Sequence, residues 1–200
     1  MSLRAPYTLW SGIYDLGVEH TTEELRRRSL SLLGQPQEQR ILLAGIGTGL
    51  DLALLPPGNE YLGIDLTPAM LRHAERRAQT LGLEIDLREG DVQAMELPDA
   101  RFDIVVMHLI LAVVPDTVAA LREAARVLRP GGRILILDKF LRPGQSAPLR
   151  RLASPLLARL ATRTDVVFED ALIEVPDLHV LEDRPALAGG WFRHILLEKD

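Results

Sequence analysis

A glycine-rich loop is the first feature of the sequence with the means to hold a ligand. Residues 44–49 read Ala-Gly-Ile-Gly-Thr-Gly and follow a short apolar run, 41–44, that is typical of a buried strand. Glycine lets the backbone turn sharply and lets a ligand approach the main chain closely. In an open α/β sheet a nucleotide-type ligand lies in the crevice at such strand ends. Taken alone, the loop is a weak signal, and the alternative is a tight strand-to-helix turn that binds nothing.

Two aspartates follow the next strands of the chain. Asp65 ends the run 61–64 and lies about twenty residues after Gly45, where an acidic side chain accepts hydrogen bonds from ribose hydroxyls. The alternative is an aspartate that only favours the helix after it. We expect Thr67 to cap that helix, which favours the ribose role. Asp91 follows the third strand and has the chemistry to accept a hydrogen bond from an adenine amino group, although a Gly-Asp pair alone is usually just a loop.

Histidine is the remaining residue type with acid–base chemistry. None of the five histidines has the H-x-x-x-H spacing of a metal site, and cysteine is absent, so the sequence predicts no metal site. His108 ends the fourth strand at the ligand-binding edge of the sheet. A polar side chain that lines the ligand pocket is the favoured interpretation, and a general base is the alternative.

The elements that must position these residues alternate between strands and helices. Strands are predicted at 41–44, 61–64, 84–87, 103–107 and 133–137, and helices at 21–33, 67–82 and 115–128. This alternation predicts a parallel sheet with helices on both faces. Residues 129–132 read as a tight turn. Further helices are expected at 147–162 and 168–175, before an antiparallel strand pair at 178–183 and 192–198.

Length and composition bound the class of protein. The chain has 200 residues, of which 47% are hydrophobic and 26% charged, and this predicts one domain, 1–200. Within it we expect a helical N-terminal lid segment, 1–38, ahead of an α/β core, 39–200. The net charge of −5 argues against nucleic-acid binding. No signal-peptide core or membrane span is recognisable, so a cytoplasmic location is expected.

Taken in order, these motifs resemble class I S-adenosylmethionine-dependent methyltransferases over about residues 40–140. Phe102-Asp103 and the run 126–132, Arg-Val-Leu-Arg-Pro-Gly-Gly, are further features of that family. The resemblance implies a Rossmann-like fold with a mostly parallel seven-stranded sheet of order 3-2-1-4-5-7-6. It also implies S-adenosylmethionine as cofactor.

The resemblance also implies roles for individual residues. The loop Gly45, Ile46, Gly47, Thr48 and Gly49 is expected to line the methionine part of the cofactor. Asp65 is expected to hold the ribose, and Leu66 to pack on the adenine. Asp91 is expected to bind the adenine amino group, with Val92 beside it and His108 in the same pocket.

One position departs from the family pattern. Many members carry an acidic residue two places before the first glycine, where this chain has Leu43. The contact usually made near the cofactor's amino group must come from elsewhere or be lost. Asp51 is a nearby acid, but it is expected to be an early helical residue that favours the helix N-terminus.

The N-terminal segment resembles a narrower group. Tyr7, Trp10, Tyr14 and Asp15 have the spacing seen at the start of quinone-biosynthesis methyltransferases and bacterial phosphatidylethanolamine N-methyltransferases. In those families this segment covers the active site, so Tyr7, Trp10 and Tyr14 are expected to form a lid over the substrate. The alternative is an aromatic segment that is simply docked on the core.

The acceptor is predicted to be a small molecule or a lipid-like compound. Residues 139–163 contain six lysines and arginines and no acidic residue, and the leucines of 147–162 form one stripe. A basic amphipathic helix of this kind can make peripheral contact with an anionic membrane. The alternative is that the leucines belong to the core and the arginines form its solvated face.

Two other functions fit parts of the sequence. A nicotinamide-dependent oxidoreductase also has a glycine loop, but its pattern is G-x-G-x-x-G, whereas this chain has G-x-G-x-G followed by Leu50. A non-catalytic domain that binds an adenosyl ligand is the third possibility. Within the methyltransferases, a phospholipid N-methyltransferase of the phosphatidylethanolamine type is the specific alternative.

Overall fold

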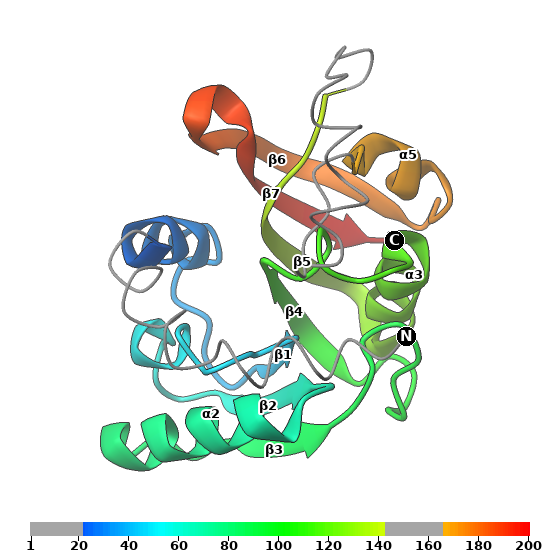
Figure 1. The fold of residues 1–200 in the computed structure, drawn as a ribbon. Coiled ribbons are helices and arrows are strands. Elements are labelled where there is room, and N and C mark those ends of the chain that lie inside the picture. Colours follow the sequence, from blue (N-terminus) through cyan, green and yellow to red (C-terminus); the bar gives the residue numbers. More distant parts are fainter. Residues whose placement is uncertain (1–21, 143–165) are drawn as a thin grey trace.

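A seven-stranded sheet of order β3-β2-β1-β4-β5-β7-β6 forms the centre of the computed structural model, which describes residues 22–142 and 166–200 (Figure 1). Its strands are β1 (Arg40–Ala44), β2 (Glu60–Asp65), β3 (Asp86–Glu89), β4 (Phe102–His108), β5 (Leu128–Lys139), β6 (Leu178–Leu187) and β7 (Phe192–Lys199). Strands β1 to β5 pair in parallel, and β7 pairs antiparallel with both β5 and β6. The predicted strand order and the antiparallel final pair are therefore confirmed.

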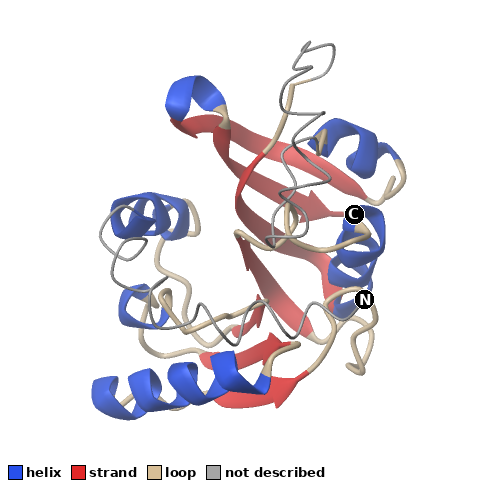
Figure 2. Cartoon of the chain, viewed as in Figure 1, coloured by secondary structure: helices blue, strands red, loops and turns tan. Residues whose placement is uncertain are grey.

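Helices cover both faces of the sheet, as Figure 2 shows. One face carries α2 (Pro68–Leu81), the short 3-10 helix η1 (Leu52–Leu54) and a helix over residues 22–31. The other face carries α3 (Thr117–Val127) and α5 (Phe168–Ile173). A 3-10 turn, η2 (Ala188–Gly190), joins the last two strands.

The two faces form two separate apolar clusters, because successive side chains of a strand point to opposite sides. In β1, Leu42 and Ala44 belong to the cluster under α3, and Ile41 and Leu43 belong to the cluster under α2. All four are almost completely buried. This arrangement on both faces holds the carboxyl ends of the parallel strands together at one edge.

Several boundaries differ from the prediction. The third strand lies two residues later than predicted, because residues 86–89 are the ones that pair with β2. Residues 129–132, predicted as a turn, lie within β5. Between the pairs Phe102–Leu128 and Ile104–Arg133, however, the register shifts, so these residues bulge out of the ladder, with Gly131 at φ +70°. The predicted helix 147–162 lies outside the described residues.

The segment after the glycine loop contradicts the expectation of a helix that starts near Asp51. Only the single turn of η1 forms there, and Leu55 is already extended. Two prolines, Pro56 and Pro57, follow at once, and proline both disfavours a helical conformation in the residue before it and cannot donate to a helix. Asp51 is therefore not an early residue of a long helix.

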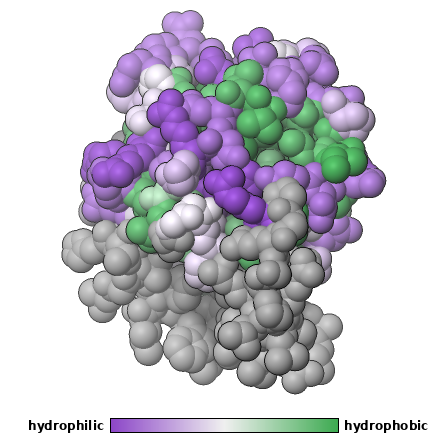
Figure 3. Space-filling model, turned by 90° about the horizontal axis from the view of Figure 1, so that it is seen from above, coloured by the Kyte–Doolittle hydropathy of each residue, from purple (hydrophilic) through white to green (hydrophobic). Residues whose placement is uncertain are grey.

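The outer surface of the described part is mostly hydrophilic when it is seen from above, with apolar side chains gathered mainly in one area (Figure 3). Exposed large apolar side chains include Ile173 of α5 and Val180, Leu181 and Leu187 of β6. Among the described residues, no helix has the length and apolar character needed to cross a membrane.

Candidate functional site

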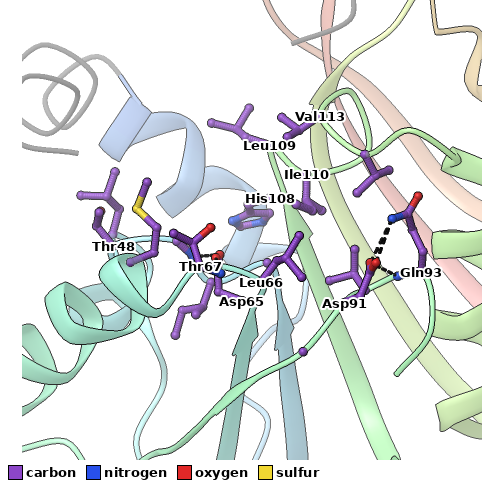
Figure 4. A pocket seen from close by; sticks show the side chains of 18 of the residues that line it. Thr48, Asp65, Leu66, Thr67, Asp91, Gln93, His108, Leu109, Ile110 and Val113 are labelled. Carbon is purple, nitrogen blue, oxygen red and sulfur yellow. Dashed lines mark hydrogen bonds between the residues drawn. The ribbon is translucent and has the colours of Figure 1, made fainter. Parts of the chain in front are cut away.

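A cavity lies at the carboxyl ends of β1, β2, β3 and β4, where the loops that follow these strands meet (Figure 4). It brings together nearly all the residues that the sequence singled out for cofactor binding. The residues that line it are Arg26, Gly45, Ile46, Gly47, Thr48, Leu50, Asp65, Leu66, Thr67, Met70, Gly90, Asp91, Val92, Gln93, His108, Leu109, Ile110, Val113 and Val114.

The glycine loop forms the floor of the cavity with a left-handed backbone. Gly45, Gly47 and Gly49 have φ values of +76°, +57° and +79°. Residues with a Cβ atom rarely adopt such positive values. A Cβ on Gly47 would meet no atom within 4 Å, so this glycine borders open space. Gly49 does not line the cavity. A Cβ there would lie 2.7 Å from Leu52 and 3.1 Å from the backbone of Ala74, so Gly49 serves close packing against α2.

Asp65 is held by backbone donors on both of its oxygens. Oδ2 accepts from the Gly47 N–H at 2.9 Å, and Oδ1 accepts from the Thr67 N–H at 2.9 Å. Burial raises the pKa of this carboxyl, and the bonds from Thr67 and Gly47 oppose that rise. Thr67 occupies the N-cap position of α2 as predicted, but its side chain makes no capping bond. Asp65 thus ties the glycine loop to the start of α2.

Asp91 is oriented by its neighbour Gln93. Oδ1 of Asp91 accepts from both the backbone N–H and the side-chain amide of Gln93, each at 2.9 Å (Figure 4). The amide oxygen of Gln93 accepts from the Asp116 N–H at 2.9 Å, ahead of α3. Leu66 and Val92 add apolar surface beside the two carboxylates.

His108 has both ring nitrogens engaged. Nδ1 lies 2.8 Å from Oδ1 of Asp51, and Nε2 lies 3.0 Å from the Ser29 hydroxyl. The side chain is only 1% exposed although the residue borders the cavity. The geometry therefore favours the pocket-lining interpretation of His108 over a base that meets substrate.

Asp51 occupies the N-cap position of η1, but its side chain makes no capping hydrogen bond and is instead part of a buried ionic cluster. Besides its contact with His108, it pairs with Arg26, whose Nη1 lies 2.8 Å from Oδ2. Burial raises the pKa of Asp51, but the positive charge of Arg26 and the contacts with His108 outweigh this and hold the pKa well below its usual range. Asp51 is therefore ionised and accepts from the Nδ1–H of His108.

Sequence reasoning missed Arg26, Ser29 and Gln93. Arg26 precedes Leu30 and Leu33 by four and seven residues, the spacing of one helix face, and both leucines are buried in the core. An arginine at a position that faces the core was the available signal. Its partner Asp51 lies 25 residues away in the chain. No local pattern connects them.

Two further features from the sequence are Leu43 and the expected aromatic lid. Leu43, which replaces the acidic residue of the family pattern, packs in the core with Leu30 and faces away from the cavity lining. The aromatic residues Tyr7, Trp10 and Tyr14 of the expected lid lie outside the described residues.

Comparisons with known proteins agree with this geometry. Residues 42–136 match the family model of a methyltransferase domain. A phosphatidylethanolamine N-methyltransferase of Cereibacter sphaeroides is 32% identical over 96% of this chain and 95% of its own. A demethylmenaquinone methyltransferase of Thermus thermophilus is 41% identical over 56% of this chain and 53% of its own.

The fold is also that of solved methyltransferases. A geranyl diphosphate C-methyltransferase from Streptomyces coelicolor superposes with a TM-score of 0.73 at 18% identity, covering 90% of this chain and 81% of that one. The family match therefore excludes the nicotinamide-dependent oxidoreductase, the alternative function that the glycine loop alone allowed. Because the phosphatidylethanolamine N-methyltransferase matches this chain along nearly the whole length of both, the chain belongs to the S-adenosylmethionine-dependent methyltransferases.

Proposed function

We propose that the cavity binds S-adenosylmethionine across the ends of β3, β2 and β1. The observation that supports this is the order of the lining groups, with Asp91 after β3, Asp65 after β2 and the glycine loop after β1. The two carboxylates suit the adenine amino group and the ribose hydroxyls. The open space at Gly47 suits the close approach of the rest of the molecule.

The cofactor supplies a methyl group on a sulfonium, which is a good leaving group. The task left to the protein is to align the acceptor with this methyl and to exclude water. Leu109, Ile110 and Val113 line the cavity beyond His108 and provide apolar surface for that purpose (Figure 4). We also propose that Tyr7, Trp10 and Tyr14 cover the acceptor.

Calorimetry with S-adenosylhomocysteine, the product form of the cofactor, tests the binding site. We expect S-adenosylhomocysteine to bind in competition with S-adenosylmethionine, and we expect NAD not to bind. The Asp65→Ala variant should lose at least about tenfold in affinity, because charge-assisted hydrogen bonds contribute about 1.5–3 kcal/mol each. Unchanged affinity in the folded variant removes Asp65 from the site.

We further propose that the acceptor is lipid-like. The relatives named above are a phosphatidylethanolamine N-methyltransferase and a demethylmenaquinone methyltransferase, and both names describe amphipathic or apolar acceptors. The phospholipid is the favoured candidate, since that relative matches along 95% of its length.

A labelled-methyl assay separates these acceptors. The protein is incubated with labelled S-adenosylmethionine and with phosphatidylethanolamine vesicles, dispersed demethylmenaquinone or total cell extract, and the organic and aqueous phases are both counted. Label in the phospholipid supports the favoured candidate, and label in the quinone supports the other. Label only in a water-soluble fraction of cell extract contradicts a lipid-like acceptor, and cofactor binding without any transfer supports the non-catalytic alternative.

The basic segment 139–163 is proposed to help the protein reach a membrane surface. Only residues 139–142 of it are described, and Lys139 among them is half-buried, so the contact rests on the arginines that follow. Sedimentation with anionic and neutral vesicles tests the proposal. We expect binding to anionic vesicles alone, lost at high salt and in an Arg150→Glu/Arg151→Glu/Arg159→Glu variant. No sedimentation at low salt contradicts it.

A further inference from the structure

Arg26 places a guanidinium at one end of the cavity. It is the only lysine or arginine among the described residues that line the cavity, and the two carboxylates there, Asp65 and Asp91, follow β2 and β3. Arg26 lies on the helix over residues 22–31 and is 8% exposed. The buried pair with Asp51 fixes it beside the end of β4, on the other side of the glycine loop from the carboxylates. The cavity therefore has N–H donors of a guanidinium at one end and carboxylate acceptors at the other.

Within the part of the chain that the structure describes, Asp51 positions the guanidinium and leaves it further N–H donors. Arginine has five N–H donors, and among the described residues Arg26 uses Nη1 toward Asp51 and Nε toward the Thr22 hydroxyl, at 3.4 Å. Asp51 itself does not line the cavity. His108 cannot take an anion instead, since both its nitrogens are engaged. Arg26 is thus the group on this wall with the chemistry to bind a carboxylate.

The chemistry of the cofactor matches this arrangement. Its adenosine end carries hydrogen-bond donors, and its amino-acid end carries an α-carboxylate. With the adenosine at Asp91 and Asp65, the amino-acid end extends past the glycine loop toward β4, where Arg26 lies. We propose that Arg26 binds the α-carboxylate of S-adenosylmethionine, with Asp51 as the residue that positions it. This inference rests on the proposed cofactor site.

A pair of ligands that differ in this carboxylate tests the inference. S-adenosylhomocysteine carries the amino-acid group, and 5′-methylthioadenosine has the same adenosine and a thioether but no amino acid. In Arg26→Gln we expect calorimetry to show a loss of about tenfold to a hundredfold in affinity for S-adenosylhomocysteine. Affinity for methylthioadenosine should stay within about twofold of wild type, because its contacts lie at the other end of the cavity.

Two further variants separate binding from folding. Arg26→Gln leaves Asp51 without its ionic partner, so the double variant Arg26→Gln/Asp51→Asn removes both charges and should show the same selective loss. Arg27 is the matched control, since it lies on the same helix, is 57% exposed and pairs with Glu23. Arg27→Gln should bind both ligands as the wild type does.

The possible outcomes are distinct. An equal loss for both ligands in Arg26→Gln and in the double variant assigns Arg26 a purely structural role and overturns the inference. Unchanged affinity for both ligands overturns it as well. If the wild type binds neither ligand, the proposed cofactor site fails, and this inference fails with it.

Discussion

The carboxylate of Asp51 holds the imidazole of His108 at 2.8 Å, between the end of β4 and the helix over residues 22–31. Ser29 and Arg26 of that helix contact the two members of this pair. The helix is therefore attached to the cavity wall by a buried polar network and not by apolar packing alone. The consequences for stability and for catalysis can be measured separately.

Loss of the Asp51 charge should destabilise the protein in a pH-dependent way. Asp51→Asn leaves Arg26 buried without a counter-ion, and breaking such a pair typically costs about 3–5 kcal/mol. Because folding lowers the pKa of Asp51, its contribution is fully present above the unfolded value of about 4 and is lost as the pH falls further, toward the folded value. Urea unfolding at pH 7, 4 and 2.5 should show a wild-type advantage that shrinks below pH 4. A constant difference across this range contradicts the assignment.

His108 is expected to hold Asp51 and Ser29 in place and not to accept a proton from the substrate. His108→Gln, which retains hydrogen-bonding capacity toward Ser29 and Asp51, should keep methyl-transfer turnover within about tenfold of wild type and leave the pH–rate profile unchanged in shape. A general base would instead account for about 10²–10⁴-fold. The measurement is kcat against pH for both proteins, with the acceptor that the labelled-methyl assay identifies. A loss of a hundredfold together with the loss of one limb of the profile restores the catalytic role.

The sheet was predictable from the sequence, and the buried network was not. Periodic apolar runs and glycine turns depend on neighbours in the chain, and they gave the alternation of strands and helices. The order of the strands came from family resemblance. The helix expected after Gly49 is only one turn long, because Pro56 and Pro57 end it. The role of Asp51 was not predictable, because its partner Arg26 is distant in the sequence.

Some residues of the candidate site were predictable from the sequence, and Arg26 was not. Gly47, Asp65 and Asp91 stand directly after strands, so parallel topology alone brings them to one edge. Arg26 reaches the cavity from a helix packed across the face of the sheet, and only the tertiary fold puts it there. Its place on the apolar face of that helix was the one local sign that it is buried.

Protonation of Asp65 should weaken cofactor binding as the pH falls. Burial raises its pKa above the ordinary value of about 3.9, and a protonated carboxyl accepts hydrogen bonds from ribose and from Gly47 less well. Affinity for S-adenosylhomocysteine should fall as the pH drops through this raised pKa. Asp65→Asn, which does not titrate, should bind more weakly at pH 7 and lack that decline. Calorimetry from pH 7.5 down to the lowest pH at which both proteins stay folded compares them, and parallel curves contradict the prediction.

Alanine at the second and third glycines of the loop should separate ligand contact from packing. Both positions have positive φ, so either substitution costs about 1–2 kcal/mol of backbone strain. A larger side chain, as in Gly47→Val, also lowers stability, so a loss of binding in that variant could not be separated from unfolding. Gly49→Ala adds overpacking against Leu52 and Ala74, about 1–3 kcal/mol more, whereas Gly47→Ala meets open space.

We therefore expect Gly49→Ala to unfold at a lower urea concentration than Gly47→Ala. Gly47→Ala should show the larger loss of affinity for S-adenosylhomocysteine per unit of lost stability, because its methyl group enters the cavity that the ligand needs. Urea titration and calorimetry on the same preparations give both quantities. If Gly47→Ala binds as the wild type does while Gly49→Ala does not, Gly47 does not contact the ligand, and the glycine loop shapes the site only through its packing on α2.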